Sequence, residues 1–536
     1  MPKQIPPSNQ IIPLAIQSPG SLGLNLEQAN QVLPPQWAIQ AENAIIDFTG
    51  RLAARYGILA TTTTAAPGQV RTIFEYRTPT GASMPIVGFD GGISSNLVNL
   101  TANSLVGTIS SVANGRWFFQ NFNSKCIGFQ AGQKPIVLQN QSSTFSNIVE
   151  SAGTAPTGGV GCCAYGRVWG IDADGQTLKW SALLDETNWG TGDSGSINLS
   201  QVWPNGVDQV NAIAAFNGAL LIFGTRQILF YSSTTPSAIG LNVGTIELSD
   251  VIEGTGCISQ FTVANIGNTD MLFLSKIGVQ SIARLMIQKS RPTALVTKWV
   301  RSTLVQELSS ETPINITGFY SPTQGFYALA LPNTGSVWVL DVRHMFTDSE
   351  GDQVARITRW TMSVYTGVEF FNRNLYLSAY WTTGVVGQYS AGSNGDNGSL
   401  FTFTIQLPWT DFETGVEQEG FGFGIKTKIK AFKGMTARFT TTFDTTANVS
   451  WFIDFSSLSS TAALPISGDA GAAWGVAEWG NAQWGTGATL QIITRPLSGT
   501  GQYLSMQVQA QVSGTFAFQQ VNILPKLLRI AYGTYT

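Results

Sequence analysis

The chain has 536 residues, enough for two to four domains or for one large repeat architecture with additions. Only 11% of the residues are charged, so neutral polar side chains must cover much of the surface, and part of that surface is expected to be buried against other subunits. The formal net charge of −3 excludes a strongly basic face for gripping nucleic acid phosphates. This balance favours a component of an assembly over a free cytosolic enzyme.

The composition of the N-terminal residues and the spacing of the cysteines indicate the compartment in which the protein is made. Residues 1–20 lack a continuous apolar stretch, and nowhere do 18 uncharged apolar residues follow one another, so neither an export signal nor a membrane span is expected. Without CxxC spacing, the cysteines are predicted to be reduced and mostly buried thiols, which indicates synthesis inside a cell. These cysteines are Cys126, Cys162, Cys163 and Cys257.

Residues 1–65 are predicted to form an extended N-terminal arm. Pro6-Pro7, Pro34-Pro35 and the tract Thr61–Thr64 disfavour long regular elements. One short helix is predicted over residues 35–43, and residues 44–52 alternate like a strand. An arm without its own core has to pack on something else, either the next domain or a neighbouring subunit.

Residues 66–406 predict strands and turns, with a clear β-hairpin at Gly218–Ser232. Similar hairpins recur at intervals of 47–55 residues, a period typical of β-propellers. Their first apolar residues are Val70, Trp117, Val168, Leu220, Met271, Phe326 and Leu375. We therefore expect an all-β fold with a propeller of six or seven blades, because each blade is stable only against its neighbours. Two β-sandwiches in tandem are the alternative, although they require no such repeat.

A helix is the exception within this region. Apolar residues at nearly 3.6 spacing predict it over residues 297–308, between two blades.

Residues 407–536 are predicted to form a C-terminal β-sandwich-like domain, after a change of composition at residues 391–420. Its six expected strands cover residues 425–432, 436–442, 449–455, 489–494, 503–512 and 515–523. A loop between the third and fourth strands repeats Trp-Gly every five residues, at Trp474, Trp479 and Trp484. These tryptophans are predicted to anchor the loop on the sandwich or on an adjacent subunit, and a sugar-stacking platform is the other reading.

Catalytic chemistry has little to build on in this sequence. The single histidine, His344, leaves no second imidazole for a proton relay or a metal cluster. Gly192-Asp193-Ser194-Gly195 resembles a protease nucleophile segment only superficially, and a glycine-rich turn explains it. Asp172-Ala173-Asp174-Gly175 lacks the remaining ligands of a calcium loop and fits a hairpin turn.

Four carboxylates gather in the predicted linker, at Asp411, Glu413, Glu417 and Glu419. Two of them could form the catalytic carboxylate pair of a glycosidase, but they are expected to be solvent-exposed residues of a loop. No catalytic, cofactor-binding or metal-ligating residue is predicted, and the protein is not expected to be an enzyme.

Several stretches together resemble a known family. They are Asn43 and Arg55-Tyr56-Gly57 after the arm, IFGTRQILFYSS at 222–233 followed by GTGC at 254–257, LFLSKIGVQSI at 272–282, VWVLDVR ahead of RITRWT, and the Trp-Gly loop. With them the chain resembles the tail nozzle proteins of short-tailed bacteriophages, also called tail tubular protein B or packaged-DNA stabilisation proteins.

The resemblance implies a virion tail protein, synthesised in the host cytoplasm, that forms a hexameric ring below the portal and adaptor. Each subunit would contribute a propeller and added β-domains, around a channel that retains and then releases double-stranded DNA without sequence-specific binding. It implies contacts with the head-tail adaptor and with tail fibres, spikes or a needle, and no active-site residues. A channel wall that is not basic fits a conduit, because a basic one would bind phosphates and slow DNA.

A second hypothesis comes from a different class of protein. It is a carbohydrate-binding or carbohydrate-cleaving propeller that recognises a host receptor, which requires exposed tryptophans such as Trp479 and, for cleavage, a pair of carboxylates in a pocket.

Overall fold

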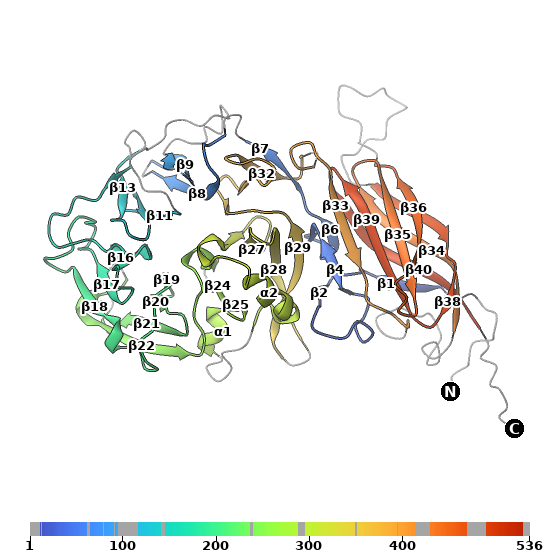
Figure 1. The fold of residues 1–536 in the computed structure, drawn as a ribbon, viewed down its shortest axis with the longest axis horizontal. Coiled ribbons are helices and arrows are strands. Elements are labelled where there is room, and N and C mark those ends of the chain that lie inside the picture. The colour runs from blue at the N-terminus through green and yellow to red at the C-terminus, as the bar shows by residue number, and fades with distance from the viewer. Residues whose placement is uncertain are drawn as a thin grey trace.

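The computed structural model describes residues 11, 13–61, 65–78, 80–90, 92–94, 116–140, 145–235, 240–267, 269–287, 295–348, 351–393, 395–412, 429–468 and 489–528. The fold has 7% helix and 52% strand, so the prediction of an all-β protein is confirmed. It consists of a ring of sheets, formed by the middle of the chain, beside a pair of packed sheets (Figure 1).

The ring is a β-propeller arrangement with five four-stranded blades. The first two blades are β11 (Phe118–Phe122), β12 (Lys125–Phe129), β13 (Ile136–Leu138) and β14 (Ser146–Asn147), and then β15 (Gly161–Ala164), β16 (Arg167–Ile171), β17 (Thr177–Trp180) and β18 (Gly195–Asn198). The next two blades are β19 (Ala212–Phe216), β20 (Ala219–Phe223), β21 (Gln227–Ser233) and β22 (Ile246–Glu253), and then β26 (Thr317–Ser321), β27 (Phe326–Leu331), β28 (Ser336–Thr347) and β29 (Gln353–Thr361). The fifth blade consists of β30 (Gly367–Glu369), β31 (Leu375–Ser378), β32 (Val386–Ser390) and β7 (Gly57–Ala60). The fifth blade therefore takes its last strand from the N-terminal part of the chain.

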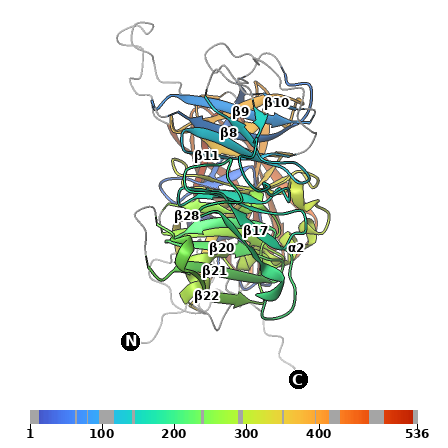
Figure 2. The ribbon, with the colours of Figure 1, turned by 90° about the vertical axis from the view of Figure 1, so that its left-hand side faces the viewer.

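Two three-stranded sheets lie in the same ring. They are β8 (Val70–Arg77), β9 (Ser83–Phe89) and β10 (Gly92–Ser94), and β23 (Ala264–Ile266), β24 (Asp270–Ser275) and β25 (Gly278–Ser281). Seen from the side, the sheets run from β8–β11 at one end of the ring to β20–β22 at the other (Figure 2). The propeller prediction is confirmed, while a count of six or seven blades remains a prediction.

All seven predicted hairpins are antiparallel pairs, and the first strand of each begins within one residue of its expected start. The hairpin at Gly218–Ser232 shows why: its apolar runs pair directly, with Phe223 opposite Ile228. The Asp208 carboxylate closes its turn by accepting the backbone N–H groups of Arg226 and Gln227, at 2.7 and 3.1 Å. Hairpins of this kind depend on neighbours in sequence, so a local pattern finds them.

Two sheets that pack on each other, here called the double sheet, lie beside the propeller (Figure 1). The first contains β37 (Thr489–Pro496), β34 (Lys430–Thr441), β40 (Phe516–Leu527), β6 (Leu52–Ala54) and β5 (Ala44–Ile46), with β1 (Leu14–Gln17) and β38 (Thr500–Gly501) alongside. The second continues the blade of β26–β29 through β4 (Gln40–Glu42) into β33 (Phe401–Gln406), β39 (Leu504–Val512), β35 (Thr445–Ile453) and β36 (Ser459–Ile466). Phe516 joins their core, with its ring 5.5 Å from that of Phe403 and 5.6 Å from that of Phe439.

The double sheet draws strands from both ends of the chain. Residues 1–65, expected to be an arm, supply its β1, β4, β5 and β6, the blade strand β7, and a small parallel pair of β2 (Gly23–Leu24) with β3 (Trp37–Ala38). Residues 407–536 therefore do not form it alone. The division at residues 65 and 406 remains a prediction.

Some local predictions are wrong. The helix expected over residues 35–43 is replaced by β3 and β4, because β4 pairs with both β29 and β33 and this pairing overrides local preference. The described parts of the two strands expected at 425–432 and 436–442 form one strand, β34, with an irregularity between Phe432 and Gly434. The strand β36 was not expected.

The helix predicted over 297–308 is confirmed as a 3-10 turn at Lys298–Val300 followed by α2 (Arg301–Leu308). A second helix, α1 (Ile282–Ile287), was not predicted. Neither described α-helix has the length and apolar run needed to cross a bilayer.

Candidate functional site

Several candidate residues named from the sequence lie outside the part of the chain that the structure describes. Trp474, Trp479 and Trp484 lie outside the described residues, as do Glu413, Glu417 and Glu419. His344 is exposed on β28, where the strand register is irregular.

The aspartates of the suspected calcium turn have local partners. Asp174 accepts the backbone N–H groups of Gln176 and Thr177, at 2.9 and 2.8 Å, and Asp172 pairs with Lys179 at 2.6 Å. Turn formation therefore accounts for these carboxylates. Among the described residues, no group of three or more His, Cys, Asp or Glu side chains could hold a metal ion.

The four cysteines form no disulfide, and Cys126, Cys162 and Cys257 are buried. Burial raises the pKa of Cys162 to about 12 and that of Cys257 to about 11, so both remain thiols at neutral pH. They are buried core side chains.

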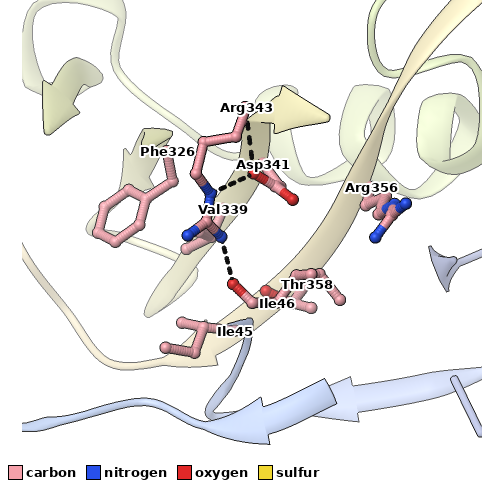
Figure 3. Close-up of a pocket in the computed structure, with 8 residues that line it drawn as sticks. All are labelled: Ile45, Ile46, Phe326, Val339, Asp341, Arg343, Arg356 and Thr358. Atoms are coloured by element: carbon pink, nitrogen blue, oxygen red, sulfur yellow. Dashed lines mark hydrogen bonds and ion pairs between the residues drawn. The ribbon is translucent and has the colours of Figure 1, made fainter. Parts of the chain in front are cut away.

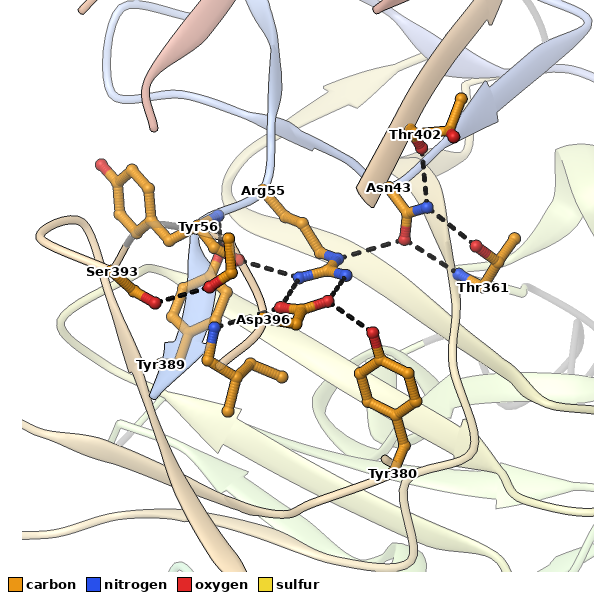
Figure 4. A network of polar contacts seen from close by, with 11 residues as sticks. Asn43, Arg55, Tyr56, Thr361, Tyr380, Tyr389, Ser393, Asp396 and Thr402 are labelled. Atoms are coloured by element: carbon orange, nitrogen blue, oxygen red, sulfur yellow. Dashed lines mark hydrogen bonds and ion pairs between the residues drawn. The ribbon is translucent and has the colours of Figure 1, made fainter. Parts of the chain in front are cut away.

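The most elaborate polar site is a buried ion pair between Arg55 and Asp396 (Figure 4). Arg55 lies between β6 and β7, and Asp396 lies in the turn between β32 and β33. Two parallel bonds of 2.8 and 2.6 Å join the guanidinium to the carboxylate, and the two side chains are 1% and 2% exposed. This bidentate geometry is the strongest form of the pair.

Further donors and acceptors complete the site around Asp396. Its carboxylate accepts the Tyr380 hydroxyl at 2.7 Å and the Ile58 N–H at 3.1 Å, while the Arg55 guanidinium donates to Asn43 Oδ1 at 3.1 Å. The guanidinium also lies 3.8 Å from the centre of the Phe401 ring. Burial and the neighbouring carboxylate raise the pKa of Tyr380 to about 12, so its hydroxyl remains a donor at neutral pH.

Asn43 extends the hydrogen-bond network to one strand of the propeller and one strand of the double sheet. Its backbone has a left-handed φ of 51°, and its side-chain amide donates to Thr361 Oγ1 and to the Thr402 carbonyl, both at 2.8 Å. Thr361 ends the blade strand β29, and Thr402 lies in β33 of the double sheet. The network, here called the junction, therefore ties the propeller to the double sheet.

A small cavity lies near the same interface, lined by Asp341, Arg343 and Arg356 among others (Figure 3). Arg343 donates through Nε to Asp341 Oδ1 at 2.9 Å and through NH2 to the Ile46 carbonyl at 2.5 Å. The cavity volume of about 10 Å³ is that of a single water and is far too small for an organic substrate. These residues tie β28 to the N-terminal segment and form no catalytic pocket.

Side-chain contacts join sheets of the propeller that are not neighbours in the ring. Phe118 of β11 packs 5.8 Å from Phe261, which precedes β23, although two blades separate these strands along the ring. Arg116 lies 3.7 Å from the same Phe261 ring and donates to the Ile314 carbonyl at 2.6 Å. Burial lowers the pKa of Arg116 to about 9. These contacts tie together parts of the ring that are separated by other blades along the chain.

No protein-family model matches the chain, and no curated protein matches it.

Sequence reasoning missed the junction for a physical reason. Arg55 and Asp396 are 341 residues apart, and neither lies in a periodic apolar pattern. Asp396 falls in the Gly- and Asn-rich stretch AGSNGDNGSL, which looks like an ordinary loop. Asn43 and Arg55 stood out only as part of the family resemblance, and nothing in the sequence names Asp396 as their partner.

Proposed function

We propose that the chain is a structural subunit of a short-tailed phage tail, in which six copies form a nozzle that continues the DNA channel below the portal and adaptor. The junction is the observation that carries this proposal. It connects an N-terminal segment to both the propeller and the double sheet. The buried Arg55–Asp396 ion pair at its centre also forms hydrogen bonds with neighbouring groups. Loss of either partner would leave a buried charge unpaired, so the two parts are held in one arrangement, as a structural subunit requires.

Contacts between non-neighbouring sheets of the ring favour a channel that lies between subunits and not through the propeller. Phe261 contacts both Phe118 and Arg116 from two blades away, so DNA is proposed to pass through the hole of the hexamer. The wall of the channel is proposed not to be basic, because a basic wall would retain phosphates. A hexamer whose lumen is lined mainly by Lys and Arg would contradict this point.

We further propose that the two three-stranded sheets are the sixth and seventh blades. β8 contacts both β11 and β30, and β23 contacts β26. The sheet of β23–β25 meets the preceding blade through Phe223 and Phe273, whose rings are 5.1 Å apart. An experimental map with seven repeats around the ring would support this count, and a gap at either three-stranded sheet would contradict it.

Electron microscopy of the purified full-length chain, alone and mixed with the adaptor ring, tests the nozzle proposal. A closed six-fold ring is expected. Particles that stay monomeric at high concentration and in the presence of the adaptor would overturn it. The remaining partners, which are fibre, spike or needle proteins, would be sought by co-purification from virions.

The alternative, a receptor-binding propeller, has a separate test. Binding on a glycan array that is lost in Trp479→Ala would favour it, since that change removes the central tryptophan of the Trp-Gly loop. Array binding that survives the change would remove the loop from consideration.

A further inference from the structure

A groove of about 270 Å³ opens at one end of the double sheet, and none of its lining residues belongs to the junction. Three segments meet there: the loop between β2 and β3, the residues after β33, and the residue before β39. The lining side chains are Gln31, Val32, Leu33, Trp409, Thr410, Asp411 and Tyr503. The volume is close to the lower limit of small-molecule sites, about 300 Å³.

An antiparallel bridge positions the two aromatic side chains. Thr410 and Leu504 exchange two backbone hydrogen bonds, of 2.9 and 3.0 Å. Trp409 and Asp411 flank one bridged residue, and Tyr503 precedes the other, so the bridge holds all three at the groove. Both rings are only half-buried.

The aromatic ring of Phe455 packs against Trp409 and Tyr503, and its backbone conformation is strained. Phe455 lies 4.9 Å from Trp409 and 5.0 Å from Tyr503 between ring centres. Phe455 and the preceding Asp454 both have left-handed φ values, 61° and 47°, which cost about 1–2 kcal/mol per residue for non-glycine residues. The Asp454 carboxylate stabilises this turn by accepting the Tyr503 N–H at 2.8 Å. Strain of this kind, which leaves an aromatic ring 53% exposed, is typical of binding sites.

A buried cation balances the carboxylates around the groove. Lys430 is fully buried, and its ammonium donates to the Gln502 carbonyl at 3.0 Å. Burial lowers its pKa to about 8, against the opposing attraction of Asp411 and Asp454. At neutral pH the lysine is therefore mainly charged, and the surroundings of the groove are not strongly acidic.

We propose that this groove binds a neutral saccharide, with the apolar face of a sugar ring on Trp409 and Tyr503 and its hydroxyl groups donating to the Asp411 carboxylate. Gln31 offers an amide that can donate to and accept from further hydroxyls. Aromatic faces and a few polar groups suit a polyol, which is apolar on the faces of its ring and polar at its edge. The site does not depend on the nozzle assignment.

A quaternary ammonium ligand is the main competitor, because aromatic rings with a carboxylate also attract cations. The observations favour the saccharide for two reasons. The positive charge of Lys430 offsets the carboxylates, and Phe455 packs against both other rings and so leaves no cage between them. Choline therefore serves as the competing probe.

The test is a glycan array followed by calorimetric titration of the best oligosaccharide into the full-length chain. Trp409→Ala and Asp411→Asn are each expected to weaken binding at least tenfold. Trp381→Ala, which removes another half-buried tryptophan, on the propeller, is the matched control and should leave the affinity unchanged. Asp411→Asn keeps the side-chain shape, so it remains informative if Trp409→Ala fails to fold.

Three results would overturn the proposal. The first is no array signal and no heat of binding at millimolar oligosaccharide. The second is oligosaccharide binding that both groove variants retain. The third is choline binding more tightly than every sugar tested. Trp479→Ala in the same titration separates this groove from the Trp-Gly loop, because the groove predicts full binding in that variant.

Discussion

The propeller and the double sheet both bury apolar strands, but they differ in the order in which the chain supplies those strands. Each four-stranded blade from β11 to β29 uses four strands consecutive in the chain. In the double sheet, by contrast, β40 lies between β34 and β6, a strand of the N-terminal segment. Damage to a blade should therefore stay near that blade, whereas damage where the two chain ends meet should spread through the molecule.

The cores differ in the same sense. Separate apolar clusters lie between neighbouring blades, such as the one around Trp169 and Trp180, whose rings are 5.6 Å apart. In the double sheet a single cluster joins both sheets to residues of the adjacent blade, including Trp338. The predictions below, in order of decreasing effect, test whether this contrast holds.

Asp396→Ala should cause the largest loss of unfolding free energy among the variants proposed here. It leaves the Arg55 guanidinium buried without its counter-ion, which costs about 3–5 kcal/mol of unfolding free energy. Chemical denaturation measures the loss. The matched control is Asp90→Ala, which removes the partner of Arg71 in an ion pair on the propeller, with side chains 22% and 47% exposed, and should cost about 1 kcal/mol or less. Equal losses would contradict the role given to the junction.

Lys430→Met tests the buried cation of the double sheet through pH. The unfolded chain keeps this proton up to the ordinary pKa of 10.5, while the folded protein loses it near 8. Between these values the folded state binds fewer protons, so its stability should rise with pH, by about 3 kcal/mol at most. Buried thiols such as Cys162, whose pKa is raised to about 12, lower the stability of both proteins as the pH approaches 10, so the quantity to compare is the unfolding free energy of the native protein minus that of the variant. Thermal unfolding from pH 7 to 10 should show this difference rising. A difference that stays constant over this pH range would contradict the role given to Lys430.

Ile58→Val and Ile523→Val make the same small deletion at buried positions in β7 and β40. Each should cost about 0.5–1.5 kcal/mol. Hydrogen exchange should quicken mainly in β7 and β32 for the first variant, and in β34, β1 and β40 for the second. Exchange that quickens everywhere in both variants would mean that the two regions unfold as one unit.

His344→Ala should have the smallest effect. The side chain is exposed at an irregular part of β28, so the change in unfolding free energy should stay within about 0.5 kcal/mol. Denaturation curves of the two proteins should overlap. A loss of oligomerisation or adaptor binding in this variant would reveal a contact role for the histidine.

The sequence predicts the propeller well because its signals are local. Each hairpin, such as Leu220–Tyr231, brings together residues that a short window already contains. The double sheet is harder, because β4 becomes a strand only through its distant partners β29 and β33. The same holds for the sites: neither the Arg55–Asp396 pair nor the meeting of Trp409 with Tyr503 leaves a short-range pattern.

The strand β7 has a consequence for how the protein is made. Thr61, directly after β7, donates its N–H and its hydroxyl to the Val386 carbonyl, 325 residues further along the chain. During synthesis this N-terminal strand has no partner until β32 leaves the ribosome, and at about 5–20 residues per second the delay lasts tens of seconds. The edges of the unfinished ring stay unpaired during that time, and a chain truncated before β32 cannot complete the fifth blade.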